Sequence, residues 1–444
     1  MAVDQARRVP VRQIMGLAVP ALGVLAAEPL YVLVDTAVVG HLGAVPLAAL
    51  SVGGTLLAQV SSMLTFFSFG TTARTARLHG AGRRADAVAE GAQATWLAVL
   101  AGVLLLLLGQ LFAEPLARLL AGPGAVADGA VGWLRIALLG TPLILITMAG
   151  NGWMRGVQDT RRPLRYVLAG NGISAVLCPV LVYGLDFGLA GSAIANVVAQ
   201  VISAGLFLRA LVVERAPLRP VPAVMRAQLG VGRDLMLRTL AFQSCYFSAT
   251  AVAAHTSAAS VAAHQVVMQL WMFVALVLDA LAVAAQSLIG AALGAGDGRG
   301  ARELAVRITR YGLVFGALLG LAFAAVTPVL PAVFTSDGSV LREIPGAWWF
   351  FVVLQPVGGV VFALDGVLLG AGDAAFMRNS TVGSAVFGCL PVVWAAAAFG
   401  WGLSGIWAGV TVFLLFRLVT VLRRLRSGRW AVTGALLVRD RAHA

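Results

Sequence analysis

Four carboxylates interrupt long apolar stretches of the sequence, at Glu28, Asp35, Asp279 and Asp365. A charged side chain near the centre of a lipid bilayer costs about 2.5–3.5 kcal/mol on insertion scales. Such a group is therefore expected to face water or a partner, and binding a proton or a cation removes much of that cost. The chemistry that these residues suggest is ion or proton binding inside a membrane rather than covalent catalysis.

The first two of these acids, Glu28 and Asp35, lie seven residues apart. On an α-helix, two residues seven apart lie on nearly the same face and are separated by about 10 Å along the helix axis. Pro29 lies between them, and because proline lacks an N–H and clashes with the preceding turn, it can kink the helix and admit water.

A carboxylate in apolar surroundings takes up a proton more readily than one in water. Loss of its charge favours closing of the helix and weakens the hold on a cationic ligand. The alternative for Asp35 is a structural acid that is hydrogen-bonded to Thr36 or to nearby backbone.

A second polar set follows a helical spacing at Asn171, Ser174 and Cys178. Positions i, i+3 and i+7 share one face of a helix. Inside an apolar stretch, such a face lines a cavity or forms hydrogen bonds to a neighbouring helix. The spacing predicts a polar helix face and leaves both interpretations open.

The composition identifies the elements that must position these residues. Of 444 residues, 60% are hydrophobic and 11% are charged, and the mean hydropathy is +0.91. This leaves too little polar surface to cover a water-soluble globule. A helix needs about 20 apolar residues to cross about 30 Å of hydrocarbon. We therefore predict an all-α polytopic membrane protein with twelve transmembrane helices, near residues 14–38, 47–71, 91–112, 130–151, 166–185, 191–212, 235–256, 260–290, 308–330, 346–369, 380–400 and 404–425.

The basic residues predict the orientation in the membrane. All 32 are arginine, and the formal net charge is +13. With these spans, all but Arg118, Arg135 and Arg342 lie on the side that holds the N-terminus. This asymmetry follows the positive-inside rule, so we expect a multi-pass protein of the cytoplasmic membrane with both termini cytoplasmic. Because the charge follows the topology instead of forming one patch, nucleic-acid binding is not expected.

An internal repeat divides the sequence into two halves. Matching residues recur after 214 positions, among them Thr36 and Thr250, His41 and His255, Pro142 and Pro356, Gly152 and Gly366, Asp159 and Asp373. Each half has six spans, and an even number gives both copies the same orientation, so the repeats are parallel. We expect an N-terminal six-helix bundle over residues 1–213, a cytoplasmic linker over 214–234, and a C-terminal six-helix bundle with a basic cytoplasmic tail over 235–444. Two such bundles that rock about a central cleft are typical of alternating-access transport.

Other functional classes are weakly supported by the residues. The sequence has no metalloprotease or serine-hydrolase motif, and its three cysteines have no paired spacing, so neither an enzyme, a metal site nor a disulfide is expected. A membrane anchor would need neither the repeat nor buried acids. A flippase for lipid-linked precursors would need a large basic cavity, whereas arginine is expected to be almost absent from helix interiors, with Arg135 as the exception.

Six stretches together make the chain resemble the multidrug and toxic compound extrusion (MATE) transporters, in the DinF-like branch. The resemblance covers nearly the whole chain. These stretches are 34–43 (VDTAVVGHLG), 155–163 (RGVQDTRRP), 188–196 (GLAGSAIAN), 262–265 (AAHQ), 278–286 (LDALAVAAQ) and 364–373 (LDGVLLGAGD).

The resemblance implies an ion-driven antiporter with two six-helix bundles around a central cleft. It implies export of small cationic or amphipathic compounds, such as drugs, toxins or metabolites, in exchange for protons or sodium. It also places Asn171, Ser174, Cys178 and Asn196 around the carboxylate of the first helix. The family commonly has Asn and Asp where this chain has Ser174 and Cys178. The expected proton site is therefore Asp35, with Glu28 as a second acid.

The remaining expectations concern the second half and the partners. Asp279 and Asp365 are candidates for a second coupling site or a gate. Sodium needs several oxygen ligands around one point, and the seventh span has no acid between Leu235 and His255, so protons are preferred over sodium as the coupling ion. We expect no cofactor beyond the ion gradient, a small-molecule substrate, a lipid bilayer as solvent, and a monomer. The sequence does not identify the exported compound.

Overall fold

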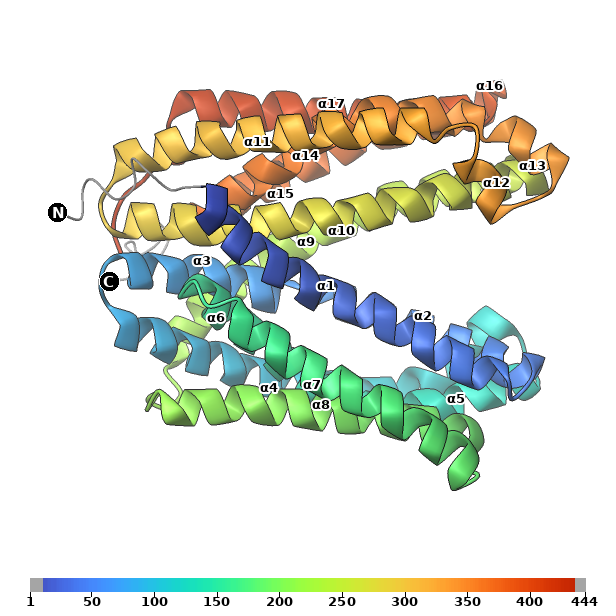
Figure 1. Ribbon diagram of the computed structural model, residues 1–444, viewed down its shortest axis with the longest axis horizontal. Coiled ribbons are helices and arrows are strands. Elements are labelled where there is room, and N and C mark those ends of the chain that lie inside the picture. The colour runs from blue at the N-terminus through green and yellow to red at the C-terminus, as the bar shows by residue number, and fades with distance from the viewer. Residues whose placement is uncertain (1–10, 436–444) are drawn as a thin grey trace. The chain divides into compact units, whose positions relative to one another are not determined.

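The computed structural model describes residues 11–435, and its regular elements are helices (Figure 1). No strand occurs between residues 11 and 435. Eleven helical segments in this range are long and apolar enough to cross a membrane. Their outer faces carry large apolar side chains; α4 (Arg84–Ala121), for example, exposes Leu104, Leu107, Leu111 and Leu119. The predicted class, an all-α polytopic membrane protein, is confirmed.

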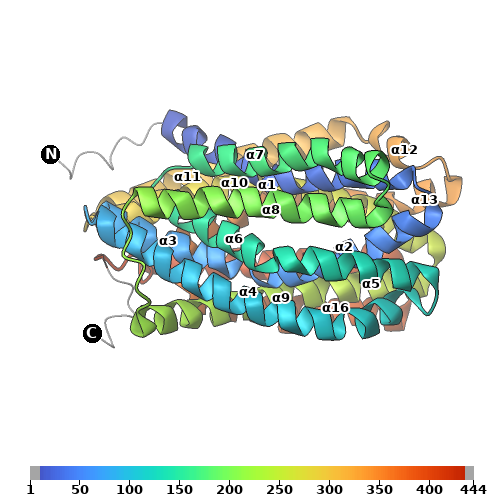
Figure 2. The ribbon, with the colours of Figure 1, turned by 90° about the horizontal axis from the view of Figure 1, so that it is seen from below.

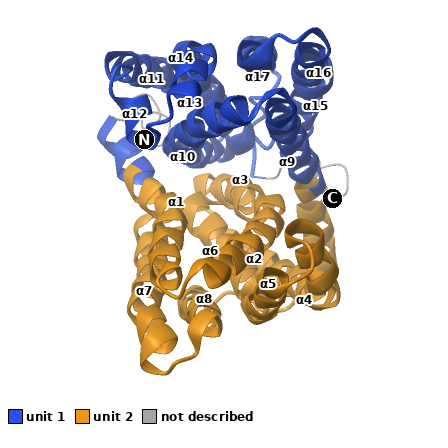
Figure 3. Ribbon diagram, turned by 90° about the vertical axis from the view of Figure 1, so that its right-hand side faces the viewer, with its two compact units in different colours: residues 1–18, 233–444 blue, residues 19–232 orange. Residues whose placement is uncertain are grey.

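The chain divides into two compact units, Val19–Gly232 and Met1–Ala18 with Arg233–Ala444 (Figure 3). The first unit holds most of α1 and the helices up to α8. These helices are α1 (Val11–Gly40), α2 (Ala44–Met63), α3 (Phe66–Gly80), α4, α5 (Ala125–Ala137), α6 (Thr141–Gly156), α7 (Arg161–Pro179) and α8 (Gly188–Val213). A short 3-10 turn, η3 (Leu138–Gly140), joins α5 to α6, and a π-helical turn, η4 (Val180–Gly184), extends α7. Helices α7 and α8 run antiparallel and side by side (Figures 1 and 2).

The second unit holds most of α9 and the helices that follow it. These are α9 (Pro222–Thr256), α10 (Ala258–Gly294), α11 (Gly298–Ala325), α12 (Leu330–Phe334), α13 (Gly338–Glu343), α14 (Pro345–Gly370), α15 (Ala374–Ser384), the π-helical turn η5 (Ala385–Cys389), α16 (Leu390–Phe399) and α17 (Gly402–Ser427). Its buried core is apolar and aromatic, with Trp271, Trp348, Phe351 and Trp407 among the most buried side chains.

The repeat is visible in the helix boundaries. Helices α2 and α3 together occupy Ala44–Gly80, and α10 occupies Ala258–Gly294, which is the same interval 214 residues later. The same shift relates α8 to α17. It also relates the two points at which the units divide, after Ala18 and after Gly232. The two halves therefore repeat their local structure as well as their residues.

One helix boundary differs from the sequence-based expectation. Residues 214–234 were expected to form a linker, but α9 begins within them at Pro222. Proline is well suited to the first position of a helix, where its missing N–H costs nothing. The expected seventh span, 235–256, is the second part of this helix. It is not among the eleven membrane-length segments, and its uncharged part, 239–256, carries polar residues such as Gln243, Ser244 and His255 among the apolar ones.

Helices α11 and α14 approach each other closely through glycines. A Cβ atom on Gly359 would overlap the backbone carbonyl of Gly312, and one on Gly312 would overlap the carbonyl of Gly359. Small residues that allow such approaches are typical of packed membrane helices. The close packing of this helix pair therefore requires the absence of side chains at both positions.

We expect Gly359→Ala to lower the stability of the folded protein by about 1–3 kcal/mol, because α11 and α14 must separate to admit the methyl group. The matched control is Gly383→Ala on α15, where the nearest atom to a new Cβ is 3.9 Å away. Alanine favours the helix over glycine, so this control is expected to be neutral or slightly stabilising. Thermal unfolding in detergent measures both; equal effects of the two substitutions would contradict the packing argument.

Candidate functional site

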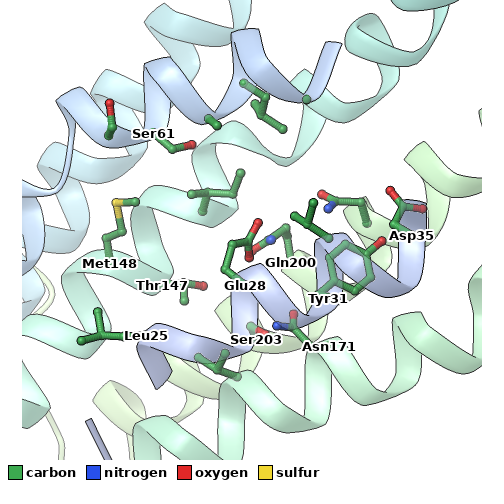
Figure 4. Close-up of a pocket in the computed structure, with 18 of the residues that line it drawn as sticks. Leu25, Glu28, Tyr31, Asp35, Ser61, Thr147, Met148, Asn171, Gln200 and Ser203 are labelled. Atoms are coloured by element: carbon green, nitrogen blue, oxygen red, sulfur yellow. The ribbon is translucent and has the colours of Figure 1, made fainter. Parts of the chain in front are cut away.

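A cavity of about 880 Å³ lies within the unit Val19–Gly232. This volume suits a drug-sized molecule. Its walls come from α1, α2, α3, α5, α6, α7 and α8. Figure 4 labels lining residues from five of these helices, α1, α2, α6, α7 and α8. The polar and charged residues among its lining are Glu28, Tyr31, Asp35, Thr36, Ser51, Thr55, Ser61, Ser62, Thr65, Ser68, Trp133, Thr147, Asn151, Arg155, Asn171, Asn196, Gln200 and Ser203.

Asp35 lies on α1 and lines this cavity with an exposed fraction of only 4%. The Sγ of Cys178, on α7, donates a hydrogen bond to its Oδ1 at 3.4 Å. Cys178 itself is fully buried and does not line the cavity. The carboxylate therefore borders the cavity on one side and packed protein on the other.

Glu28 is exposed and also lines the cavity. Figure 4 shows Leu25, Glu28, Tyr31 and Asp35 along the α1 side of this space. Helix α1 continues through Pro29, which lies next to Glu28. Because proline donates no backbone hydrogen bond, the helix has a local weak point between its two acids. Helix α1 thus carries both predicted acids into one cavity.

The polar face predicted on α7 is split by the structure. Asn171 lines the cavity, as does Asn196 of α8, whereas Ser174 and Cys178 are fully buried behind the wall. Two buried atoms of the cavity wall have no hydrogen-bond partner among the described residues, Asn171 Nδ2 and Asn196 Oδ1. Leaving such a group unsatisfied costs about 1–3 kcal/mol. This wall is therefore suited to hydrogen bonding with water or a polar ligand.

The two predicted acids of the second half belong to the other unit. Asp279, on α10, is half-buried. Asp365, on α14, is buried and accepts hydrogen bonds from Arg238 Nη2 at 2.7 Å and from Arg417 Nη2 at 2.7 Å on both oxygens. The Arg417 guanidinium also lies over the Phe242 ring, 4.8 Å from its centroid. Asp365 is thus the centre of an ion cluster with two arginines. Its coupling or gating role, and that of Asp279, remain predictions.

The expectation that arginine is almost absent from helix interiors was wrong. Arg417 and Arg155 are buried, with exposed fractions of 1% and 4%, whereas Arg135 is exposed. The burial of Arg417 is possible because Asp365 supplies the opposite charge and accepts its hydrogen bonds.

Three polar cavity residues of α6 were not predicted from the sequence. Asn151 and Arg155 line the cavity, one helical turn apart, and Thr147 precedes them by one more turn. The signal was present, since Thr147, Asn151 and Arg155 repeat at four-residue spacing in the fourth predicted span or just beyond its end. Such a row is a polar stripe on one helix face.

A polytopic helical protein with a duplicated bundle and a drug-sized cavity lined by two acids, one of them buried, has the construction of a membrane transporter. Comparison with known proteins agrees. The MatE family model matches residues 20–180 and 235–394. The chain is 34% identical to the chloroplastic protein DETOXIFICATION 44 of Arabidopsis thaliana, over 94% of this chain and 83% of that protein. It is 31% identical to DNA damage-inducible protein F of Escherichia coli (strain K12), over 93% and 92%.

The fold is also shared with solved structures. An outward-facing multidrug resistance MATE family transporter of the MOP superfamily aligns with a TM-score of 0.84 at 21% identity, over 96% of this chain and 98% of that chain. The chain belongs to the MatE family of multidrug and toxin efflux transporters. The resemblance seen in the sequence is therefore confirmed, and the protein is a transporter and not an enzyme.

Proposed function

We propose that this transporter exports small cationic or amphipathic compounds in exchange for protons, by alternating access. The observation that carries the proposal is the position of Asp35, a nearly buried carboxylate on the wall of a drug-sized cavity. Such a group changes the charge of the cavity when it binds a proton. Glu28 on the same helix provides a second site for charge, and the small-molecule substrate occupies the same cavity.

The coupling follows from competition for one negative charge. When Asp35 is ionised, it attracts a cationic group in the cavity, and because Asp35 is nearly buried this attraction is weakened less than it would be in bulk water. When Asp35 binds a proton, the cation loses this interaction and is released. Proton and substrate therefore bind alternately, which is the condition for exchange. Asn171 and Asn196 supply hydrogen-bonding groups beside the acid that suit both a ligand and water.

The proposed setting is the cytoplasmic membrane, with the protein as a monomer and both termini on the cytoplasmic side. The arginine asymmetry supports the orientation of the termini, because all but three of the 32 arginines are expected on the side of the N-terminus. Protons entering the cell down their gradient would then drive export.

Transport by purified protein in liposomes tests the coupling ion. A fluorescent cation is loaded, and either a pH gradient or a sodium gradient is imposed alone, with the membrane potential clamped by potassium and valinomycin. We expect the pH gradient alone to drive efflux of the dye well above that from protein-free liposomes, and the sodium gradient alone to drive none. Full transport driven by the sodium gradient alone would show that the coupling ion is sodium and not the proton. Transport that needs neither gradient would overturn exchange altogether.

A further inference from the structure

The α1 wall of the cavity carries two carboxylates at a fixed separation. Glu28 and Asp35 both line the cavity, and the seven residues between them correspond to about 10 Å along the helix axis. Figure 4 shows the two acids toward different ends of one row, with Tyr31 between them. Neither acid forms an ion pair with another described residue. The wall therefore presents two negative charges that a ligand can neutralise.

Amide groups of α8 accompany the two acids. Asn196 lines the cavity and lies beside the Tyr31 hydroxyl, one turn before Asp35 on α1. Its exposed fraction is 6%, and its Oδ1 has no hydrogen-bond partner among the described residues. Gln200 also lines the cavity, one turn further along α8, and it appears next to Glu28 in Figure 4. Each carboxylate thus has an amide in its neighbourhood.

The group that suits each of these positions is an ammonium with N–H donors. Carboxylate and amide oxygens are acceptors, and the unpaired oxygen of Asn196 needs a donor. A protonated primary amine supplies a positive charge and three N–H donors, whereas a quaternary ammonium supplies the charge alone. Water satisfies an amide oxygen but leaves the two negative charges uncompensated.

The third charged residue that lines the cavity lies at its other end. Arg155 of α6 donates a hydrogen bond from Nη1 to Ser68 Oγ at 3.2 Å. Ser68 belongs to α3, beyond the end of α2, whereas Asp35 is near the turn that joins α1 to the start of α2. The positive charge of Arg155 therefore repels ammonium groups toward the α1 wall.

Taking the proposed export function as given, we propose that the two acids of α1 and the two amides of α8 form a pair of ammonium sites that select diamines. One ammonium group binds between Glu28 and Gln200. The other binds Asp35 and donates to the unpaired Oδ1 of Asn196, and the apolar chain between the two groups lies along Tyr31. The preferred compound carries two charged nitrogens about 10 Å apart, the separation of the two acids along α1. A monoamine occupies only one of the two sites.

Three compounds test the pair of sites. Octamethylenediamine spans both acids, aminooctanol has the same chain with a terminal hydroxyl in place of one amine, and trimethylenediamine is too short to reach both. Binding to purified protein in detergent is measured by isothermal titration calorimetry at neutral pH, without an ion gradient. We expect octamethylenediamine to bind at least about tenfold more tightly than either other compound, because hydrogen bonds to a charged group contribute about that factor.

Removal of either acid is expected to abolish this advantage. Glu28→Gln and Asp35→Asn each keep the size of the side chain and leave one ammonium site. Aminooctanol binding should then change less than about threefold, because this compound binds the remaining acid. Glu28→Asp retains the charge and should retain the preference for the diamine over aminooctanol. Glu114→Gln, on α4 and outside the cavity lining, is the control and should change no affinity.

A fourth compound tests the role of the amides. Octamethonium has the same chain and the same two charges but no N–H donor, so it leaves Asn196 Oδ1 unpaired. We expect it to bind at least about tenfold more weakly than octamethylenediamine. Asn196→Leu removes the acceptor and should reduce this difference, whereas a purely steric effect of the methyl groups would leave it unchanged.

Three results would overturn the pair of sites: equal affinities for octamethylenediamine and aminooctanol, an advantage of the diamine that persists in both Glu28→Gln and Asp35→Asn, or octamethonium binding as tight as that of the diamine. Because binding is measured without a gradient, these results are independent of ion coupling. If a pH gradient drives dye export while the diamine preference is absent, only the pair of sites is wrong. If the preference is present but no ion gradient drives transport, only the proposed coupling is wrong.

Discussion

Replacing Asp35 by asparagine is expected to lower proton-driven export by about 100-fold, the upper part of the usual range for coupling between two sites. Asparagine keeps the size of the side chain and can still accept the hydrogen bond from Cys178, but it cannot bind or release a proton. The measurement is export of a cationic dye from liposomes under an imposed pH gradient. The variant is expected to fold normally, so its elution from a sizing column should match that of the unmodified protein.

The matched control is Glu114→Gln, which removes a carboxylate from a half-exposed position on α4 that pairs with Arg118. This change should leave export within about twofold, because the ion pairs of exposed groups contribute little. Asp35→Glu, which retains an ionisable group, is expected to keep part of the activity. If Asp35→Asn exported the dye at the normal rate under the same gradient, Asp35 would not be the coupling acid.

The second large effect is expected at Asp365. Its replacement by asparagine leaves Arg238 and Arg417 close together without the carboxylate between them. Removing one partner of a buried ion pair costs about 3–5 kcal/mol, because the remaining charge stays buried without compensation. We therefore expect Asp365→Asn to unfold at a clearly lower temperature, or to express poorly. Thermal unfolding in detergent measures this effect.

A control and a compensating variant make this expectation specific. Glu303→Gln, at an exposed position on α11 in the same unit, should leave the unfolding temperature nearly unchanged. The double variant Asp365→Leu with Arg417→Met replaces the most buried pair by apolar groups, and is expected to recover much of the lost stability. If Asp365→Asn were as stable as the unmodified protein, the cluster of Asp365 with its two arginines would contribute little to stability. If the double variant folds, its transport activity tests the coupling role predicted for Asp365.

Much of the fold could be predicted because the signals are local. Apolar length predicts the spanning helices, and the 214-residue repeat predicts their recurrence, which the structure shows at the ends of α3 and α10. The acids of α1 were found in the same way, since a carboxylate within an apolar stretch is unusual. Both acids line one cavity because their seven-residue spacing places them on the same face of the helix, and this spacing can be read from the sequence.

The parts that could not be predicted depend on contacts between distant residues. Arg417 follows Asp365 by 52 residues, and nothing local to either position shows that they pair. On α7, spacing places Asn171, Ser174 and Cys178 on one face, but not the point at which the cavity ends along that face. Only Asn171 reaches the cavity, and Cys178 instead supports Asp35 from behind.

The two dividing points of the units fall inside helices, after Ala18 in α1 and after Gly232 in α9, and not in the connection between the repeats. A polypeptide severed at residue 214 would therefore not yield two self-sufficient pieces. The leading turns of the second piece, Pro222 to Gly232, group with the first piece, and residues 11–18 of the first group with the second. If the two fragments were produced together, reassembly would require the first helical turns of each fragment to pack against the other. Neither fragment is therefore a suitable module for building chimaeric transporters.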